Sequence, residues 1–201
     1  MRNRVVIVAV ALLFGCSNAF GQFQVNFGYA LSTWTTTIAS DYHPSERFDG
    51  FTAGVGYSFV LSNNLYLTPG LNYLFAGMKL ATDENWTRHY LNIPVTLGYD
   101  LAFARNAKFF VFAGPTASFG LASTTKVTAS ALGYQANTRI DNYDGDGYKR
   151  FDIMIGGGAG IKFADKYCFK VGYDYGLLNR IDSSNASEHR GQLTVGIAYL
   201  F

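Results

Sequence analysis

Three consecutive residues near the C-terminus have the side-chain types of a hydrolytic triad. Ser187, Glu188 and His189 are of the kinds that serve as nucleophile, acid and base. Consecutive side chains of an extended chain point in opposite directions, so these three cannot form a triad by themselves. His43 and His89 lie elsewhere in the chain, and we interpret them as structural or interfacial residues. We therefore predict no catalytic residue and a protein that is not an enzyme.

A second candidate site lies in the middle of the chain. Asn142, Asp144, Asp146 and Gly147 resemble the start of a calcium-binding loop, where oxygen ligands occupy alternate positions. The first ligand position holds Asn142, and the twelfth holds Ile153 where such a loop carries glutamate. This mismatch favours a solvated, turn-rich loop, so we predict no metal site and no cofactor.

The segments that would position these residues alternate strictly between large apolar and small or polar side chains. In Gly191–Phe201 large apolar residues stand at the odd positions 193, 195, 197, 199 and 201, and mostly small or polar residues stand between them. Successive side chains of a β-strand point to opposite faces, so such a segment has one apolar face. The same odd-numbered pattern recurs in eight runs, although Phe110 and Phe112 blur it: Phe23–Ser32, Phe51–Leu61, Leu65–Ala76, Leu91–Phe103, Val111–Leu121, Phe151–Phe163, Tyr167–Gly176 and Gly191–Phe201.

The links between these runs alternate in length. Short links (Ser62–Asn64, Ala104–Lys108 and Ala164–Lys166) alternate with long ones (Thr35–Arg47, Gly77–Arg88, Ala122–Arg150 and Leu177–His189). Short inner turns and long outer loops are typical of bacterial outer-membrane barrels. We predict an all-β fold, an eight-stranded antiparallel up-and-down transmembrane β-barrel with four long outer loops.

A soluble barrel is the alternative, and it would place large residues inside. Here the opposite face is rich in glycine, including Gly54, Gly56, Gly156, Gly158 and Gly160. A narrow eight-stranded interior needs small residues, whereas a surface in water does not. The mean hydropathy of +0.07 is too low for a bundle of membrane helices but suits a barrel that is apolar on one face.

The N-terminus has the layout of a secretory signal peptide. Arg2 and Arg4 precede an apolar run, and small residues follow it. We predict a signal peptide at residues 1–21 and a barrel domain at residues 22–201, with cleavage after Ala19 and lipidation of Cys16 as alternatives. Without residues 1–21 the chain carries 14 basic and 14 acidic residues, so nothing in its charge favours a nucleic-acid partner. Cys168 would be the remaining cysteine, which excludes an intrachain disulfide.

Four charged residues fall on the even-numbered, inward side of the predicted strands. They are Asp100, Lys162, Lys170 and Asp174. Charges inside a low-dielectric wall are costly unless they are paired, so we predict a lumen charge network of salt bridges that plugs the barrel. An ion pathway is the alternative. At the C-terminus we interpret Phe201, the terminal aromatic residue of the closing strand, as an assembly signal for the barrel-assembly machinery.

Several of these strand patterns resemble the PorT-like family of small outer-membrane β-barrel proteins of Bacteroidetes-type bacteria. The similar segments are Tyr90–Val95 with Leu97–Tyr99, Phe110–Pro115, Phe151–Ile153 with Gly156–Gly160, and Tyr173–Leu177. The resemblance implies an eight-stranded outer-membrane barrel, and some relatives are linked to a protein secretion system. No catalytic residue is implied.

We therefore expect an integral protein of the bacterial cell outer membrane with a structural, surface-binding or secretion- and assembly-accessory role through its outer loops. A narrow channel and a lipid-modifying barrel enzyme are the alternatives. The expected partners are outer-membrane lipid, the barrel-assembly machinery and other envelope or secretion proteins, with no nucleic acid. We expect a monomer.

Overall fold

The computed structural model describes residues 21–38, 41–42, 46–81, 84–131, 134–141, 143, 148–181 and 186–201. Its strands are β1 (Gly21–Ile38), β2 (Asp41–Tyr42), β3 (Glu46–Val60), β4 (Leu65–Ala81), β5 (Glu84–Ala104), β6 (Ala107–Ala131), β7 (Tyr134–Asp141), β8 (Phe151–Phe163), β9 (Tyr167–Gly176) and β10 (Ala186–Leu200). The described residues contain no helix long and apolar enough to cross a membrane. The predicted signal peptide, with Cys16, lies outside the described residues apart from Gly21.

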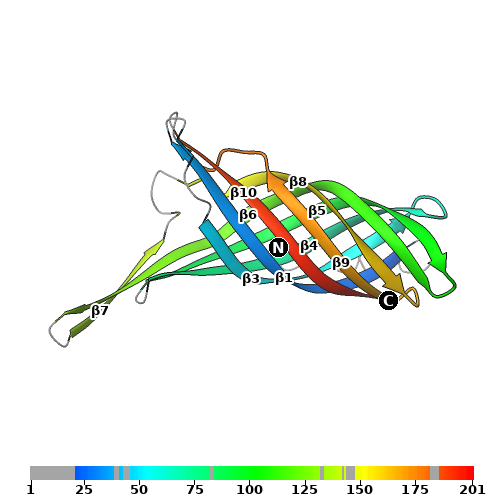
Figure 1. Cartoon of the computed structure of the whole chain (residues 1–201), viewed down its shortest axis with the longest axis horizontal. Helices are drawn as coiled ribbons and strands as arrows, with labels where there is room; N and C mark the ends of the chain where they lie inside the picture. Colours follow the sequence, from blue (N-terminus) through cyan, green and yellow to red (C-terminus); the bar gives the residue numbers. More distant parts are fainter. Residues whose placement is uncertain are drawn as a thin grey trace, which may run out of the picture.

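Eight of the described strands close into an antiparallel ring (Figure 1). Each strand pairs with the next in chain order through β1, β3, β4, β5, β6, β8, β9 and β10, and β10 pairs back onto β1. The closing register runs from Gln24↔Leu200 to Ile38↔Ala186, so the last strand is paired along its whole length. The predicted eight-stranded up-and-down barrel is confirmed.

The outer surface of the ring carries the large apolar side chains. On β5 the odd-numbered residues from Ile93 to Phe103 are exposed, and the same holds on β8 from Phe151 to Phe163 apart from half-buried Gly157 and Ala159. The even-numbered residues face the lumen, which holds hydroxyl and amide side chains such as Asn92, Thr116 and Ser118. A barrel surrounded by lipid is expected to have large apolar side chains outside and polar side chains inside. A water-soluble barrel does not show this arrangement.

The glycines of the inner face make room for two aromatic rings. Phe110 and Phe112 point into the lumen, which resolves the ambiguity in this part of the sequence pattern. A Cβ atom on Gly158 would approach the Phe112 Cζ atom to 2.7 Å, and one on Gly172 would approach it to 3.0 Å. The glycine-rich inner faces of β8 and β9 therefore leave room for rings from β6, the strand that pairs with β8.

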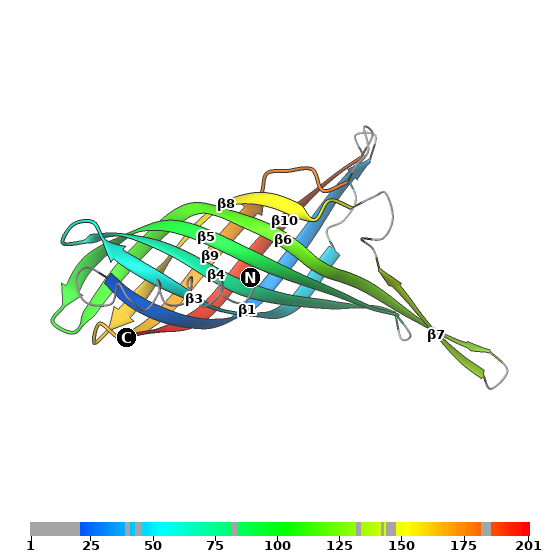
Figure 2. The same cartoon turned by 180° about the vertical axis from the view of Figure 1, so that it is seen from behind.

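All four expected outer loops are shorter than predicted, because β1 runs to Ile38, β3 begins at Glu46 and β10 begins at Ala186. The other two loops are hairpins. β4 continues to Ala81 and β5 begins at Glu84, so this link is a hairpin. β6 continues to Ala131 and pairs with β7 from Thr124↔Asp141 to Ala131↔Tyr134. Figures 1 and 2 show this β6–β7 hairpin projecting far beyond the ring, at the end opposite the C-terminus. Sequence periodicity did not predict these extensions. A strand outside the membrane does not face lipid, so its residues need not alternate between apolar and polar.

Candidate functional site: the closed lumen and its outer mouth

Two of the four predicted lumen charges form an ion pair at the inner end of the barrel. The Lys162 Nζ atom donates to both carboxylate oxygens of Asp100, at 2.7 and 2.9 Å. The same ammonium lies 3.9 Å from the centre of the Tyr66 ring. The Lys162–Asp100 ion pair and the Tyr66 ring lie in the lumen, close to the short turns at the inner end of the barrel.

The other two predicted charges lie apart from this pair. Lys170 and Asp174 both line a cavity of about 130 Å³ inside the barrel, and neither forms an ion pair with another described residue. They are four residues apart on one strand, so their side chains leave the wall at different heights. The four residues therefore form one ion pair and two separate charges and not a continuous network.

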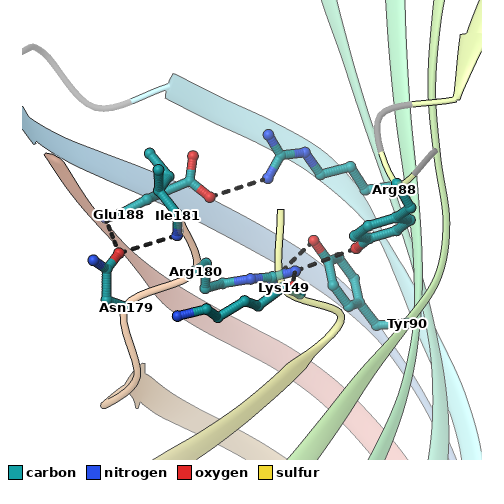
Figure 3. Close-up of polar contacts among 8 residues, drawn as sticks. Arg88, Tyr90, Lys149, Asn179, Arg180, Ile181 and Glu188 are labelled. Carbon is teal, nitrogen blue, oxygen red and sulfur yellow. Dashed lines mark hydrogen bonds and ion pairs between the residues drawn. The ribbon is translucent and has the colours of Figure 1, made fainter. Parts of the chain in front are cut away.

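A larger group of charges closes the opposite, outer end, and the sequence analysis missed it. Arg88, Arg180 and Arg190 are at most 2% exposed, as are the carboxylates Asp152 and Glu188. In Figure 3, Arg88 and Glu188 point toward each other and Arg180 points toward Tyr90, and these side chains come from separate segments. Such a concentration of buried charge needs mutual compensation, since burying an unpaired charge is very costly.

Arg88 of β5 is held by aromatic rings and one carboxylate. Its guanidinium carbon lies 4.5 Å from the Trp34 ring centre, 4.7 Å from Trp86 and 5.0 Å from Phe48. Its Nη1 atom lies 3.7 Å from Glu188 Oε1, and both side chains are 3% exposed. The aromatic faces and the carboxylate together compensate a cation that water does not reach.

Arg190 of β10 spans the lumen one layer closer to the membrane. Its Nη2 atom donates to Ser118 Oγ at 2.9 Å, and its guanidinium carbon lies 4.3 Å from the Tyr90 ring centre. Asp152 of β8 accepts a hydrogen bond from the backbone N–H of Leu178 at 3.2 Å. The β9–β10 connection is thereby attached to the wall at its first turn.

Arg180 comes from that connection and extends toward Tyr90 (Figure 3). Its Nη1 atom donates to the Tyr90 hydroxyl at 3.0 Å, and its Nη2 atom donates to the Tyr143 hydroxyl at 3.2 Å and to the Lys149 carbonyl at 3.1 Å. Burial raises the pKa of the Tyr143 phenol to about 12, so this hydroxyl stays neutral at physiological pH and accepts the bond.

Sequence could have revealed part of this cluster. Five residues of the cluster have even numbers, like the inward-facing residues of the apolar part of the strands. The even-numbered positions thus continue to face inward beyond that part, at Arg88, Tyr90, Asp152, Glu188 and Arg190. Arg180 lies outside any strand, so periodicity contains no signal for its position.

The residues considered for catalysis do not assemble. Glu188 is buried in the lumen, whereas His189 stacks on Tyr175 with ring centres 5.9 Å apart and contacts the Gly176 carbonyl at 3.1 Å. His89 contacts the Tyr73 hydroxyl on the neighbouring strand. The calcium-like residues Asn142, Asp144, Asp146 and Gly147 lie outside the described residues.

The terminal Phe201 is 68% exposed beside the inner turns. Its backbone N–H donates to the Phe23 carbonyl at 2.9 Å, and its ring centre lies 5.8 Å from that of Phe23 and 4.8 Å from that of Tyr199. It therefore extends the seam between the first and last strands by one residue.

Known structures share this architecture at low sequence identity. Ail, the attachment invasion locus protein of Yersinia pestis, is 12% identical with a TM-score of 0.51, and the match covers 91% of this chain and 100% of Ail. Neisserial surface protein A is 14% identical with a TM-score of 0.48 (89% and 97% covered), and the outer membrane enzyme PagL is 14% identical with a TM-score of 0.41 (86% and 98% covered). No curated protein matches the chain significantly.

The sequence itself matches a family model over most of its length. The model describes an outer membrane protein beta-barrel domain and covers residues 15–182. The closed ring, the apolar exterior and the polar interior agree with that description. The chain therefore belongs to the outer membrane protein beta-barrel domain family and is an integral protein of the bacterial outer membrane.

Proposed function

We propose that this protein is a closed outer-membrane scaffold that binds another macromolecule outside the cell through its outer hairpins. The observation that supports this role is the β6–β7 hairpin. β6 makes its last pair with β8 at Phe119↔Phe151 and then continues to Ala131 with β7 at its side. A strand pair far longer than a connection requires, mounted on a rigid barrel, is a typical binding element.

A closed interior supports a binding role over transport. The Asp100–Lys162 pair lies near the inner end, and the arginine cluster lies at the outer end. Eight-stranded barrels are filled by their own side chains, and this one retains a cavity of only about 130 Å³. A steady current from the wild-type protein in a planar bilayer would contradict this closed state.

We propose that the barrel has no enzymatic activity. Among the described residues, the only adjacent acid and histidine near the outer rim, Glu188 and His189, lie on opposite faces of β10. An unchanged lipid acylation profile after deletion of the gene is the expected result. An altered profile that His189→Ala fails to restore would overturn this proposal.

The resemblance to PorT-like proteins supports an accessory role in assembly or secretion. The segments that resemble PorT-like proteins lie on β5, β6, β8 and β9, in the membrane-spanning wall. We propose that other envelope or secretion proteins are the partners, and that the barrel-assembly machinery inserts the chain. Accumulation of normally secreted proteins in the periplasm of a deletion strain is the expected outcome, and unchanged secretion would restrict the role to surface binding.

The hairpin can be tested with a variant that leaves all pairs between β6 and β8 in place. Residues 125–140, which lie beyond the pair Thr124↔Asp141 and include the outermost pair Ala131↔Tyr134, are replaced by a two-residue Asn-Gly turn. We expect in-cell cross-linking followed by purification to recover the partner with the wild-type protein and to lose it with this variant. Lys108→Ala, which removes an exposed ion pair with Asp165 at the inner end, is the control and should bind normally. Equal recovery of the partner with both variants would refute the role of the hairpin.

A further inference from the structure

The lipid-facing wall of the barrel has an apolar groove near its inner end. The groove has a volume of about 620 Å³ and crosses β8, β9, β10 and β1, which are consecutive in the ring (Figure 1). In the row of side chains nearer the inner turns, Tyr167 pairs with Phe163 on one side and with Tyr199 on the other. In the next row, Phe169 pairs with Ile197. The volume lies within the range of ligand pockets, so the groove can hold a defined ligand.

The side chains that line the groove stand out from the wall. Phe163, Tyr167 and Ile197 are 57%, 58% and 60% exposed, whereas Leu97 on β5, which does not line the groove, is 46% exposed. The Tyr167 ring packs edge-on against the Tyr199 ring, with ring centres 5.4 Å apart. A hollow between projecting apolar side chains, on a face surrounded by hydrocarbon, fits an acyl chain.

Basic residues lie beyond the inner end of the groove. Arg105, Lys108 and Lys166 lie at or beside the β5–β6 and β8–β9 turns, where Asp165 is the one acidic residue. A backbone hydrogen bond of 2.9 Å joins these two turns. Asp165 pairs with Lys108 at 2.6 Å, so the turns retain an excess of positive charge. Basic side chains beside a membrane attract anionic lipid headgroups.

Lys166 links the basic turns to the groove. It directly precedes Tyr167, and its carbonyl accepts a hydrogen bond from the Leu200 N–H at 2.8 Å, so it lies between β9 and the end of β10. Lys166 is exposed. The apolar stem of a lysine can follow an apolar wall while its ammonium reaches the headgroup layer. Lys166 therefore lies where the phosphate of a lipid is expected when an acyl chain of that lipid occupies the groove.

We propose that the groove is a binding site for one anionic phospholipid of the inner leaflet. One acyl chain lies between the two rows of side chains, and the phosphate lies at Lys166. The short inner turns border the groove, so lipids of the inner leaflet reach it. Phosphatidylglycerol carries a net negative charge and phosphatidylethanolamine does not, so the basic turns favour phosphatidylglycerol. This site is separate from the outer hairpins and does not depend on their binding role.

Native mass spectrometry of the mature barrel tests the headgroup contact. The barrel is released from nanodiscs that contain equal parts of phosphatidylglycerol and phosphatidylethanolamine. We expect the wild type to retain one phosphatidylglycerol, and Lys166→Gln to retain about fivefold less, which is the effect of losing one cation near an anionic headgroup. Lys126→Gln removes the same charge from the outer part of β6 and should retain as much lipid as the wild type does.

A second pair of variants tests the groove itself. Ile197→Trp places an indole ring in the groove and should lower the retention of phosphatidylglycerol at least about fivefold, whereas Leu97→Trp places the same ring on lipid-facing β5 and should not. Wild-type retention in both Lys166→Gln and Ile197→Trp would overturn the proposal, as would equal losses in the two control variants. Equal retention of the two lipids by the wild type, or a second copy of the barrel in place of lipid, would also overturn it. If Ile197→Trp fails to fold, Lys166→Gln alone decides.

Discussion

At the scale of single residues, the outer mouth shows how charge can be buried beside a membrane. Arg88 contacts three aromatic rings and one carboxylate, and Arg180 and Arg190 share the Tyr90 ring. Each cation is matched by groups from a different strand or connection, so the cluster ties the wall together across the lumen. The largest cost in free energy arises when one charged residue is removed and its charged partner stays buried without compensation.

Arg88→Ala should therefore be strongly destabilising. The substitution leaves Glu188 buried without its closest cation, and we expect a loss of about 3–5 kcal/mol in the free energy of unfolding. Arg88→Met combined with Glu188→Gln removes both charges and should cost clearly less than the single change. Urea unfolding of the reconstituted barrel measures both values. A double variant as unstable as Arg88→Ala would show that ring packing, and not charge compensation, dominates at this position.

The neutral Tyr143 phenol adds a pH dependence at this scale. Its pKa in the folded protein is about 12, above the ordinary value of 10.0, so its contribution to stability is complete below pH 10 and is lost as the pH rises toward 12. We expect Tyr143→Phe to reduce this alkaline loss of stability. Identical pH profiles of unfolding for the two proteins between pH 9 and 12 would contradict the assignment.

At the scale of elements, the barrel wall is built from strands of unequal character. The β8 and β9 strands are lined with glycine where they face the lumen, and β6 supplies the rings that fill the space above them. Strand parity thus determines more than which face meets lipid. It also determines where one strand must carry glycine so that the large rings of the strand beside it fit inside the lumen.

Gly158→Val should test this complementarity. The new side chain would collide with the Phe112 ring, whose Cζ atom lies 2.7 Å from the position of a Cβ atom, and with the β9 backbone. We expect destabilisation of about 1–3 kcal/mol from overpacking, measured by urea unfolding. Gly77→Ala is the matched control, because its nearest neighbour is an ordinary 3.6 Å contact with Phe75. Equal effects of the two substitutions would mean that the glycines are needed for backbone conformation and not for space.

At the scale of the whole molecule, the fold depends on joining the two ends of the chain. The pairing of β1 with β10 removes the last open edge of the ring, and the Phe201 N–H adds one more bond to Phe23. An open edge in a membrane would leave backbone groups without partners, which hydrocarbon does not tolerate. The pairing of β1 with β10 is therefore required for the ring to be stable in hydrocarbon.

Deletion of Phe201 should reduce insertion into the outer membrane more than replacement of residues 125–140 does. The deletion removes the terminal aromatic residue of the closing strand, whereas the hairpin lies outside the ring. Quantification of folded barrel in outer-membrane fractions, by its altered mobility in unheated gel samples, measures the difference. Normal levels of the Phe201 deletion would remove the assembly role that we assign to this residue.

The sequence by itself determined the closed barrel, because two-residue periodicity, glycine placement and alternating link lengths are local consequences of a wall between lipid and a narrow lumen. β8 and β9 begin and end at the predicted residues for this reason. The hairpin extensions of β4–β5 and β6–β7 were not predictable in this way, since strands in water need no apolar face. Only the tertiary structure decided which charges meet: Lys162 pairs with Asp100 from 62 positions away in the chain, and Arg180 reaches Tyr90 from 90 positions away. Such contacts depend on how far each strand is shifted and tilted around the ring, and no local pattern encodes that shift.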